Sequence, residues 1–140
     1  MTFNYSHYCK ERLLSTFPHF FDNERYREVI TNYSEEDGIS AHALYEEVLC
    51  DFVLNNIKGP SKENKDVLQQ AFELIEELAN HEDFEVTCVA YASFVERFIC
   101  YLQPMKDVEK YLGPKSLEMA REIAKMRFGR NPFTWEKEEG

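Results

Sequence analysis

The chain has 140 residues, of which 44% are hydrophobic and 14% aromatic. This length and composition suit one folded domain, residues 1–140, and exclude a chain that is disordered throughout. The formal net charge of −10 at pH 7 disfavours direct binding to nucleic acids or anionic membranes, because their phosphates would be repelled.

The first half of the chain is predicted to form three helices. Apolar residues recur at intervals of three and four, and Pro, Gly and capping residues fall between the periodic segments. Asp22 is the expected N-cap of the second helix, with Glu24 in its first turn. The expected helices are Tyr5–Thr16, Asp22–Tyr33 and Ser40–Asn56, and Ser34–Gly38 is the loop before the third.

A fourth helix follows the Gly59-Pro60 break, with Ser61 placed to cap it. Asp83 can cap a fifth helix, Phe84–Leu102, which is apolar almost all round and is therefore expected at the buried centre. Val67–Leu102 resembles one HEAT-type hairpin, in which an amphipathic helix, an acidic turn and an apolar helix follow one another. A solenoid needs about three such units, so the fold is at most partly HEAT-like.

Proline and glycine mark the helices at the end of the chain. Pro104 opens a short helix to about Leu112, and Pro114–Phe128 is a last helix ended by Gly129. Phe133 and Trp135 are expected to pack back on the bundle, and residues 136–140 to fray. The sequence thus predicts an all-α, compact bundle of six or seven helices around the central helix.

Cysteine usage and the absence of targeting signals favour a cytoplasmic protein. No CxxC pair is present, and three of the four cysteines lie in apolar helical segments, so we expect buried free thiols. The N-terminus lacks a signal-peptide pattern, and no apolar run reaches the roughly 18–20 residues that cross a bilayer. The cysteines are Cys9, Cys50, Cys88 and Cys100.

We find no pattern of catalytic or metal-binding residues. A structural zinc site needs four donors at short paired spacings, and a di-metal bundle needs two Glu-x-x-His motifs. The closest donor pairs are His7 with Cys9, and His42 with Glu46, and neither completes such a set. The Gly-x-Ser-x-Gly, Ser-x-x-Lys and phosphate-loop motifs are also missing. We therefore predict no catalytic residues, no metal and no cofactor.

Negative charge is concentrated in the middle of the chain. From Glu28 to Glu85 there are 15 acidic and three basic side chains, a net charge of −12, whereas the remainder carries +2. This surface either keeps the protein in solution or docks a basic protein, and aromatic residues among the acids favour docking. Glu73, Glu76 and Glu77 are expected on the outer face of the fourth helix. The candidate partner-binding residues are Glu35, Glu36, Asp37, Tyr45, Glu46, Glu47 and Asp51.

In its size, acidity, aromatic content and all-helical character, the chain resembles the immunity proteins of bacterial toxin systems, including the contact-dependent growth-inhibition type. The segments that carry the resemblance are Asp66–Leu102 and Glu35–Asp51. It implies a monomer that forms a 1:1 complex with a cognate basic toxin domain, often a nuclease, and covers its active site. Two alternatives stay open, namely a HEAT-like adaptor in a larger assembly and a small helical-bundle enzyme with a carboxylate site.

Overall fold

The computed structural model describes residues 3–32, 40–101 and 106–131, and helices form the regular structure in these ranges. Helix α1 (Tyr5–Thr16) has the predicted bounds, and the side chain of Asn4 caps it by accepting the N–H of His7. A 3₁₀ helix, η1 (Pro18–Asp22), then leads to α2 (Glu24–Thr31). The N-cap of α2 is Asn23, so the prediction of Asp22 was wrong. Pro18 starts a separate short helix that takes up Asp22.

The third and fifth predicted helices are continuous, but each has a π-helical centre. The third consists of α3 (Ser40–Leu44), the π segment η2 (Tyr45–Cys50) and α4 (Asp51–Asn56). The fifth consists of α6 (Phe84–Ala90), the π segment η3 (Tyr91–Val95) and α7 (Glu96–Tyr101). The two π segments pack against each other. Periods of three and four did not predict them, because a π turn leaves the apolar pattern on either side of it intact.

Three more helices complete the described fold: α5 (Lys62–Ala79), α8 (Lys106–Glu109) and α9 (Pro114–Phe128). Ser61 caps α5 and Asp83 caps α6, as predicted. Gly129 ends α9 in the left-handed conformation, with φ of 62°. If α3–η2–α4 and α6–η3–α7 are each counted as one helix, the described ranges contain seven helices besides the short 3₁₀ helix η1. This confirms the all-α fold class.

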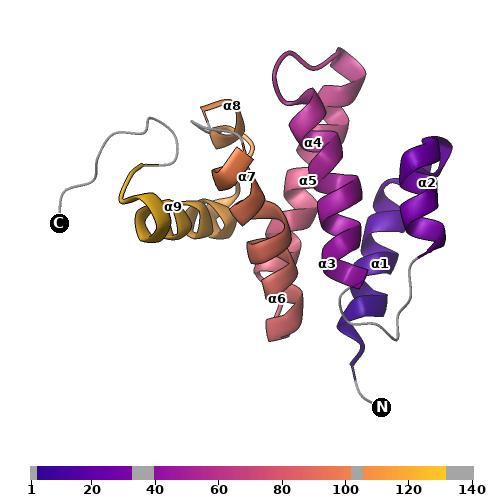
Figure 1. The fold of residues 1–140 in the computed structure, drawn as a ribbon, viewed down its shortest axis with the longest axis horizontal. Coiled ribbons are helices and arrows are strands. Elements are labelled where there is room, and N and C mark those ends of the chain that lie inside the picture. Colours follow the sequence, from indigo (N-terminus) through magenta and orange to yellow (C-terminus); the bar gives the residue numbers. More distant parts are fainter. Residues whose placement is uncertain (1–2, 33–39, 102–105, 132–140) are drawn as a thin grey trace.

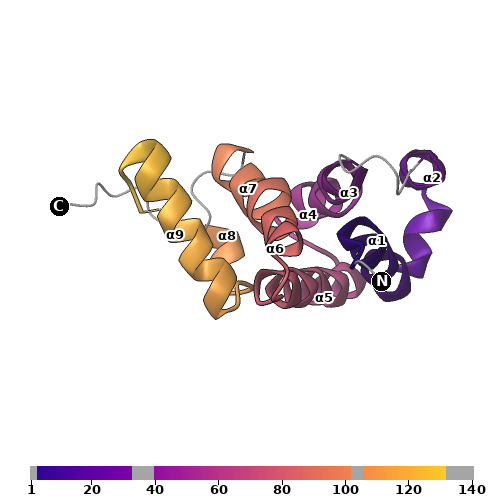
Figure 2. The ribbon, with the colours of Figure 1, turned by 90° about the horizontal axis from the view of Figure 1, so that it is seen from below.

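The α6–η3–α7 helix lies at the centre of the molecule, as its composition predicted. The helices stand side by side along the longest axis, with α2 at one end and α9 at the other (Figures 1 and 2). The central helix packs on α5 and α9 and also meets α1, α3 and η2. The ring centroid of Phe94 lies 5.4 Å from that of Phe72 in α5 and 4.7 Å from that of Phe98. Both pairs are edge-to-face, a geometry that adds about 0.5–1.5 kcal/mol per pair to stability beyond the burial of the rings.

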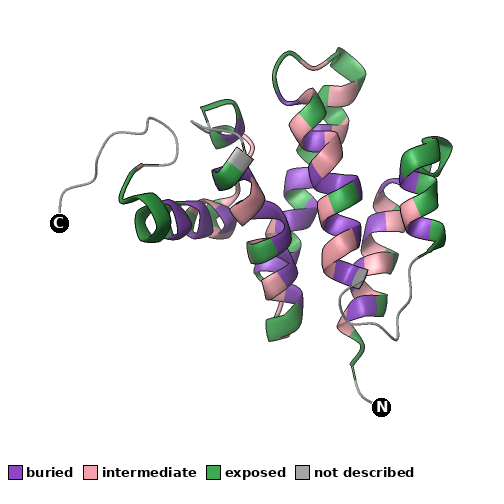
Figure 3. Cartoon of the chain, viewed as in Figure 1, coloured by how far each residue is buried: buried purple, intermediate pink, exposed green. Residues whose placement is uncertain are grey.

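Burial follows the facing sides of the helices, as Figure 3 shows. Cys9 and Cys50 are buried, and burial raises the pKa of each thiol to about 12, so both stay protonated at neutral pH. Cys88 is only half-buried and Cys100 is exposed, so the expectation of buried thiols was wrong for these two positions. They lie on the outer side of the central helix, where the apolar composition does not reveal the direction of a single side chain.

Several predictions fall outside the described residues. These are the loop Ser34–Gly38, the start of a short helix at Pro104, the position of Phe133 and Trp135, and the fraying of residues 136–140. Among the described helices, none combines the length and the apolar character needed to span a membrane.

Candidate functional site

Asp51, the first residue of α4, is held by the neighbouring helix α2. Its carboxylate accepts a 2.8 Å hydrogen bond from the Tyr26 hydroxyl and a 3.1 Å bond from the amide of Asn55. The guanidinium of Arg25 lies 3.6 Å from the same carboxylate. Burial and the bond to Asp51 raise the pKa of Tyr26, so the phenol remains a donor at neutral pH. Asp51 therefore joins α4 to α2.

Glu46 and His42 turn to the central helix. The carboxylate of Glu46 is 3.7 Å from the guanidinium of Arg97, and Nδ1 of His42 is 2.5 Å from Oγ of Ser93. The two members of the closest His–carboxylate pair in the sequence thus have different partners. Ser93 is fully buried, so its bond to His42 ties two helices together and does not expose a nucleophile.

Tyr45 is a core residue, and its assignment to a docking surface was wrong. The side chain is 0% exposed, and its hydroxyl donates a 2.7 Å hydrogen bond to the carbonyl of Cys9 on α1. A tyrosine among acids in the sequence resembles an interface anchor, but this ring points inward from η2. Burial of the ring and satisfaction of its hydroxyl explain why it occupies this position.

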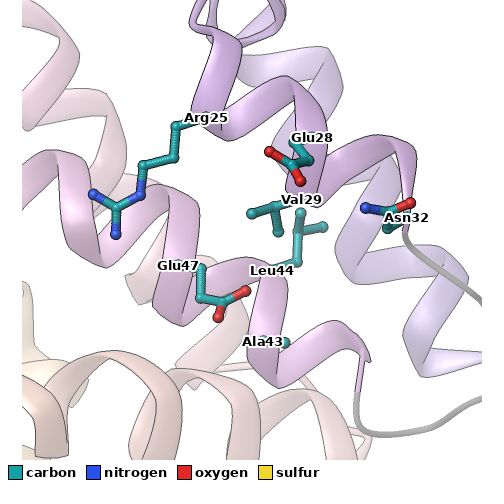
Figure 4. Close-up of a pocket in the computed structure, with 7 residues that line it drawn as sticks. All are labelled: Arg25, Glu28, Val29, Asn32, Ala43, Leu44 and Glu47. Atoms are coloured by element: carbon teal, nitrogen blue, oxygen red, sulfur yellow. The ribbon is translucent and has the colours of Figure 1, made fainter.

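Glu47 is exposed and borders a cleft of about 310 Å³ between α2 and the α3–η2 helix. Figure 4 shows the carboxylates of Glu28 and Glu47 facing this cleft from opposite sides, with Val29 and Leu44 between them. Leu44 is fully buried beneath the cleft, so the accessible apolar floor consists of Val29 and Ala43, which are half-buried. The residues that line the cleft are Arg25, Glu28, Val29, Asn32, Ala43, Leu44 and Glu47.

The two cleft carboxylates have no basic partner among the described residues. Among the described residues, Arg25 is the one cation that lines the cleft, and its guanidinium lies 3.6 Å from Asp51. Figure 4 shows its side chain extending away from Glu28. Glu28 and Glu47 form no ion pair or side-chain hydrogen bond with any described residue. A cationic group entering here would gain two carboxylates and would cover apolar floor with its aliphatic part.

Of the three acids expected on the outer face of α5, Glu73 and Glu77 are exposed and Glu76 is half-buried. Glu76 and Glu77 are both engaged by other helices. Glu76 accepts hydrogen bonds at 2.9 Å from the backbone N–H groups of Lys115 and Ser116, at the start of α9. Glu77 accepts two bonds from Arg12 of α1, at 2.6 and 2.9 Å. The partners lie about 40 and 65 residues away in the sequence, so spacing along one helix could not predict them.

The remaining candidates, Glu35, Glu36 and Asp37, lie outside the described residues. Of the predicted set, the structure therefore brings Glu47 to a cleft and engages Glu46 and Asp51 in contacts between helices. No group of three His, Cys, Asp or Glu side chains in the described ranges is arranged to hold a metal ion.

A family model described as a domain of unknown function (DUF7674) matches residues 10–127. The chain belongs to this family. The DUF7674 segment begins in α1 and ends in α9, so it includes both sides of the cleft. Neither the curated proteins nor the solved structures contain a match to the chain.

In this DUF7674 chain, the sequence analysis missed the half of the cleft that α2 contributes. Arg25, Glu28, Val29 and Asn32 lie at positions i, i+3, i+4 and i+7, which places them on one face of a helix. This spacing could have predicted from the sequence that the four residues share a helix face. It could not show that the face lies against α3 and η2, since the pairing of the two helices is a tertiary feature.

Proposed function

We propose that the chain is an immunity protein, which binds a basic toxin domain in a 1:1 complex in the cytoplasm and neutralises it by covering its active site. The observation that carries the proposal is the open cleft between α2 and η2. Its two carboxylates, Glu28 and Glu47, lack a basic partner among the described residues, whereas Glu46, Asp51, Glu76 and Glu77 have partners within the chain.

Electrostatics support a basic protein as the occupant. Two carboxylates at the rim and the net charge of −10 give a negative field that attracts a cationic surface and accelerates its approach. The half-buried side chains of Val29 and Ala43 add apolar contact area that a purely solubilising surface does not need. A nuclease fits as the toxin class, because its active site must itself be basic to hold nucleic acid phosphates.

The test is direct binding to a purified basic toxin domain at several salt concentrations, and the proposal places the gene for that toxin directly upstream of the gene for this chain. We expect a 1:1 complex whose association rate falls as NaCl rises from 50 to 300 mM, since salt screens the attraction. The complex should also suppress the activity of the toxin. A toxin domain that neither binds nor is inhibited at low salt would contradict the proposal.

Reversing the charges of the two cleft carboxylates tests whether the toxin domain binds at the cleft. We expect Glu28→Lys with Glu47→Lys to slow association at least tenfold at 50 mM NaCl and to have a smaller effect at 300 mM. Asp51 is a poor position for this test because it holds Tyr26 and Arg25. The control is reversal of Glu11 and Glu82, two exposed acids that lie away from the cleft.

A further inference from the structure

A second hollow on the surface shows how a carboxylate of this chain pairs with an arginine of a neighbouring helix. It lies between α1 and α5, has a volume of about 330 Å³ and is lined in part by Arg12, Glu73 and Glu77. There the guanidinium of Arg12 makes a two-point contact with Glu77, through Nε at 2.6 Å and through a terminal nitrogen at 2.9 Å. Tyr8 also donates to Glu77. An arginine of the chain thus bridges two helices in this hollow.

The cleft between α2 and the α3–η2 helix has a similar volume, but the arginine that lines it, Arg25, pairs with Asp51 and with neither Glu28 nor Glu47. Its volume is about 310 Å³, near the lower end of the roughly 300–1,000 Å³ of ligand pockets, which suits one side chain better than an extended ligand. The cleft therefore offers two carboxylates and an apolar floor to a group from outside.

We propose that this cleft receives a single arginine side chain of the partner protein. The guanidinium lies at the carboxylates of Glu28 and Glu47, and its methylene groups lie on the half-buried side chains of Val29 and Ala43 (Figure 4). This inference rests on the proposed function, since it names the chemical group by which a basic partner is recognised.

Arginine fits better than lysine for a geometric reason. The carboxylates come from different helices and face the cleft from opposite sides, so one cation must donate in two directions. A planar guanidinium has five N–H donors arranged as a fork, whereas an ammonium group acts as a compact, strongly hydrated point charge. Asn32 at the rim can accept a further N–H through its side-chain oxygen.

The experiment is an NMR titration of the ¹⁵N-labelled full chain with three blocked tripeptides: acetyl-Gly-Arg-Gly-amide, its lysine analogue and its citrulline analogue. Citrulline matches arginine in shape but is neutral. We expect saturable shifts of the amides of Val29, Asn32, Ala43 and Leu44 with the arginine peptide. The lysine peptide should bind several-fold more weakly, and the citrulline peptide should cause no saturable shift.

The variants test the two carboxylates separately from overall charge. Glu28→Gln with Glu47→Gln should lower the affinity for the arginine peptide about tenfold, which corresponds to about 1.4 kcal/mol of binding free energy. Glu11→Gln with Glu82→Gln removes the same charge elsewhere and should leave the affinity unchanged. Unchanged amide positions outside the cleft verify that each variant is folded.

Three results would overturn the inference: equal binding of the arginine and citrulline peptides, lysine binding as tight as arginine binding, or no loss of affinity in the cleft variant. Failure of the proposed function looks different. If the toxin domain binds the cleft variant and the control variant equally well, the arginine site is wrong and the immunity function stands. If no toxin domain binds but the peptide results hold, the function is wrong and the site stands.

Discussion

Polar side chains in and near the core join helices that are distant in the sequence. Tyr45 connects η2 to α1 through its bond to the Cys9 carbonyl, and Asp51 connects α4 to α2 through Tyr26. Glu76 connects α5 to α9. Each of these groups is satisfied by a specific partner, so each contributes to the geometry of the fold as well as to its stability.

The hydroxyl of Tyr45 should matter for stability and not for partner binding. Tyr45→Phe removes a buried 2.7 Å hydrogen bond while retaining the ring, so we expect a loss of about 1 kcal/mol in the free energy of unfolding. Urea denaturation measures this change. Toxin binding under conditions where the variant is folded should be unaltered. A weaker complex with unchanged stability would return Tyr45 to the docking surface.

Acid should destabilise the protein partly through Glu76. Burial alone would raise the pKa of Glu76, but the bonds from Ser116 and Lys115 outweigh it and hold the pKa below its ordinary value of 4.5. A lowered pKa in the folded state means that this stabilisation is complete above pH 4.5 and is lost as the pH falls below it. We therefore expect the free energy of unfolding to fall between about pH 5 and pH 3.

Glu76→Gln is the variant that isolates this effect. The neutral amide cannot titrate and accepts the two N–H groups less well, so stability at pH 7 should fall by about 1–2 kcal/mol, the range for a lost helix cap. Its stability should also depend less on pH between 5 and 3 than that of the wild type. Glu77, whose pKa the bonds from Arg12 also lower, remains to titrate in this variant. An unchanged pH profile would show that Glu76 does not cap α9.

At the scale of elements, α9 depends on α5 for its N-terminal cap. Its N-cap residue is Gly113, which has no side chain to accept the first N–H groups, and the carboxylate of Glu76 accepts them instead. The requirement for glycine comes from this close approach. A Cβ atom at Gly113 would lie 2.5 Å from Cδ of Glu76 and 2.6 Å from Oε1.

Gly113→Ala should therefore loosen the contact between α9 and α5. The new methyl group displaces the Glu76 carboxylate from Ser116 and Lys115, so we expect a loss of about 1–2 kcal/mol, as for the loss of a helix cap. The protection of α9 amides from hydrogen exchange should drop more than that of α1 amides. Gly59→Asn is a useful comparison because the φ of Gly59 is 84° and nothing lies near a Cβ there. Asn tolerates that conformation, so its effect should be small.

At the scale of the whole molecule, the charge distribution should make stability depend on salt. The net charge is −10, and the acids are concentrated between Glu28 and Glu85, so the folded state carries repulsion that screening relieves. We expect the melting temperature to rise as NaCl increases from 20 to 300 mM. The rise should be about 4 °C for each kcal/mol by which salt increases the free energy of unfolding. The Glu28→Gln, Glu47→Gln variant should show a smaller rise. A melting temperature that falls with salt would mean that internal ion pairs such as Arg12–Glu77 outweigh the repulsion.

The sequence alone determined the helical class, the bounds of α1 and α9, the caps Ser61 and Asp83, and the central position of Phe84–Tyr101. These features depend on apolar periodicity and on interactions within a few residues, which a sequence displays directly. The resemblance to immunity proteins and the function that it implies stay predictions.

Only the tertiary structure decided which acids are free to meet a partner. The sequence does not distinguish Glu28 and Glu47 from the other acids of the middle segment. In the structure, four of these acids have partners on other helices, namely Glu46, Asp51, Glu76 and Glu77. Tyr45, expected at the surface, is in the core because η2 turns it toward α1. Such contacts join residues that the chain separates by tens of positions. The packing of helices in space, which local periodicity does not encode, brings them together.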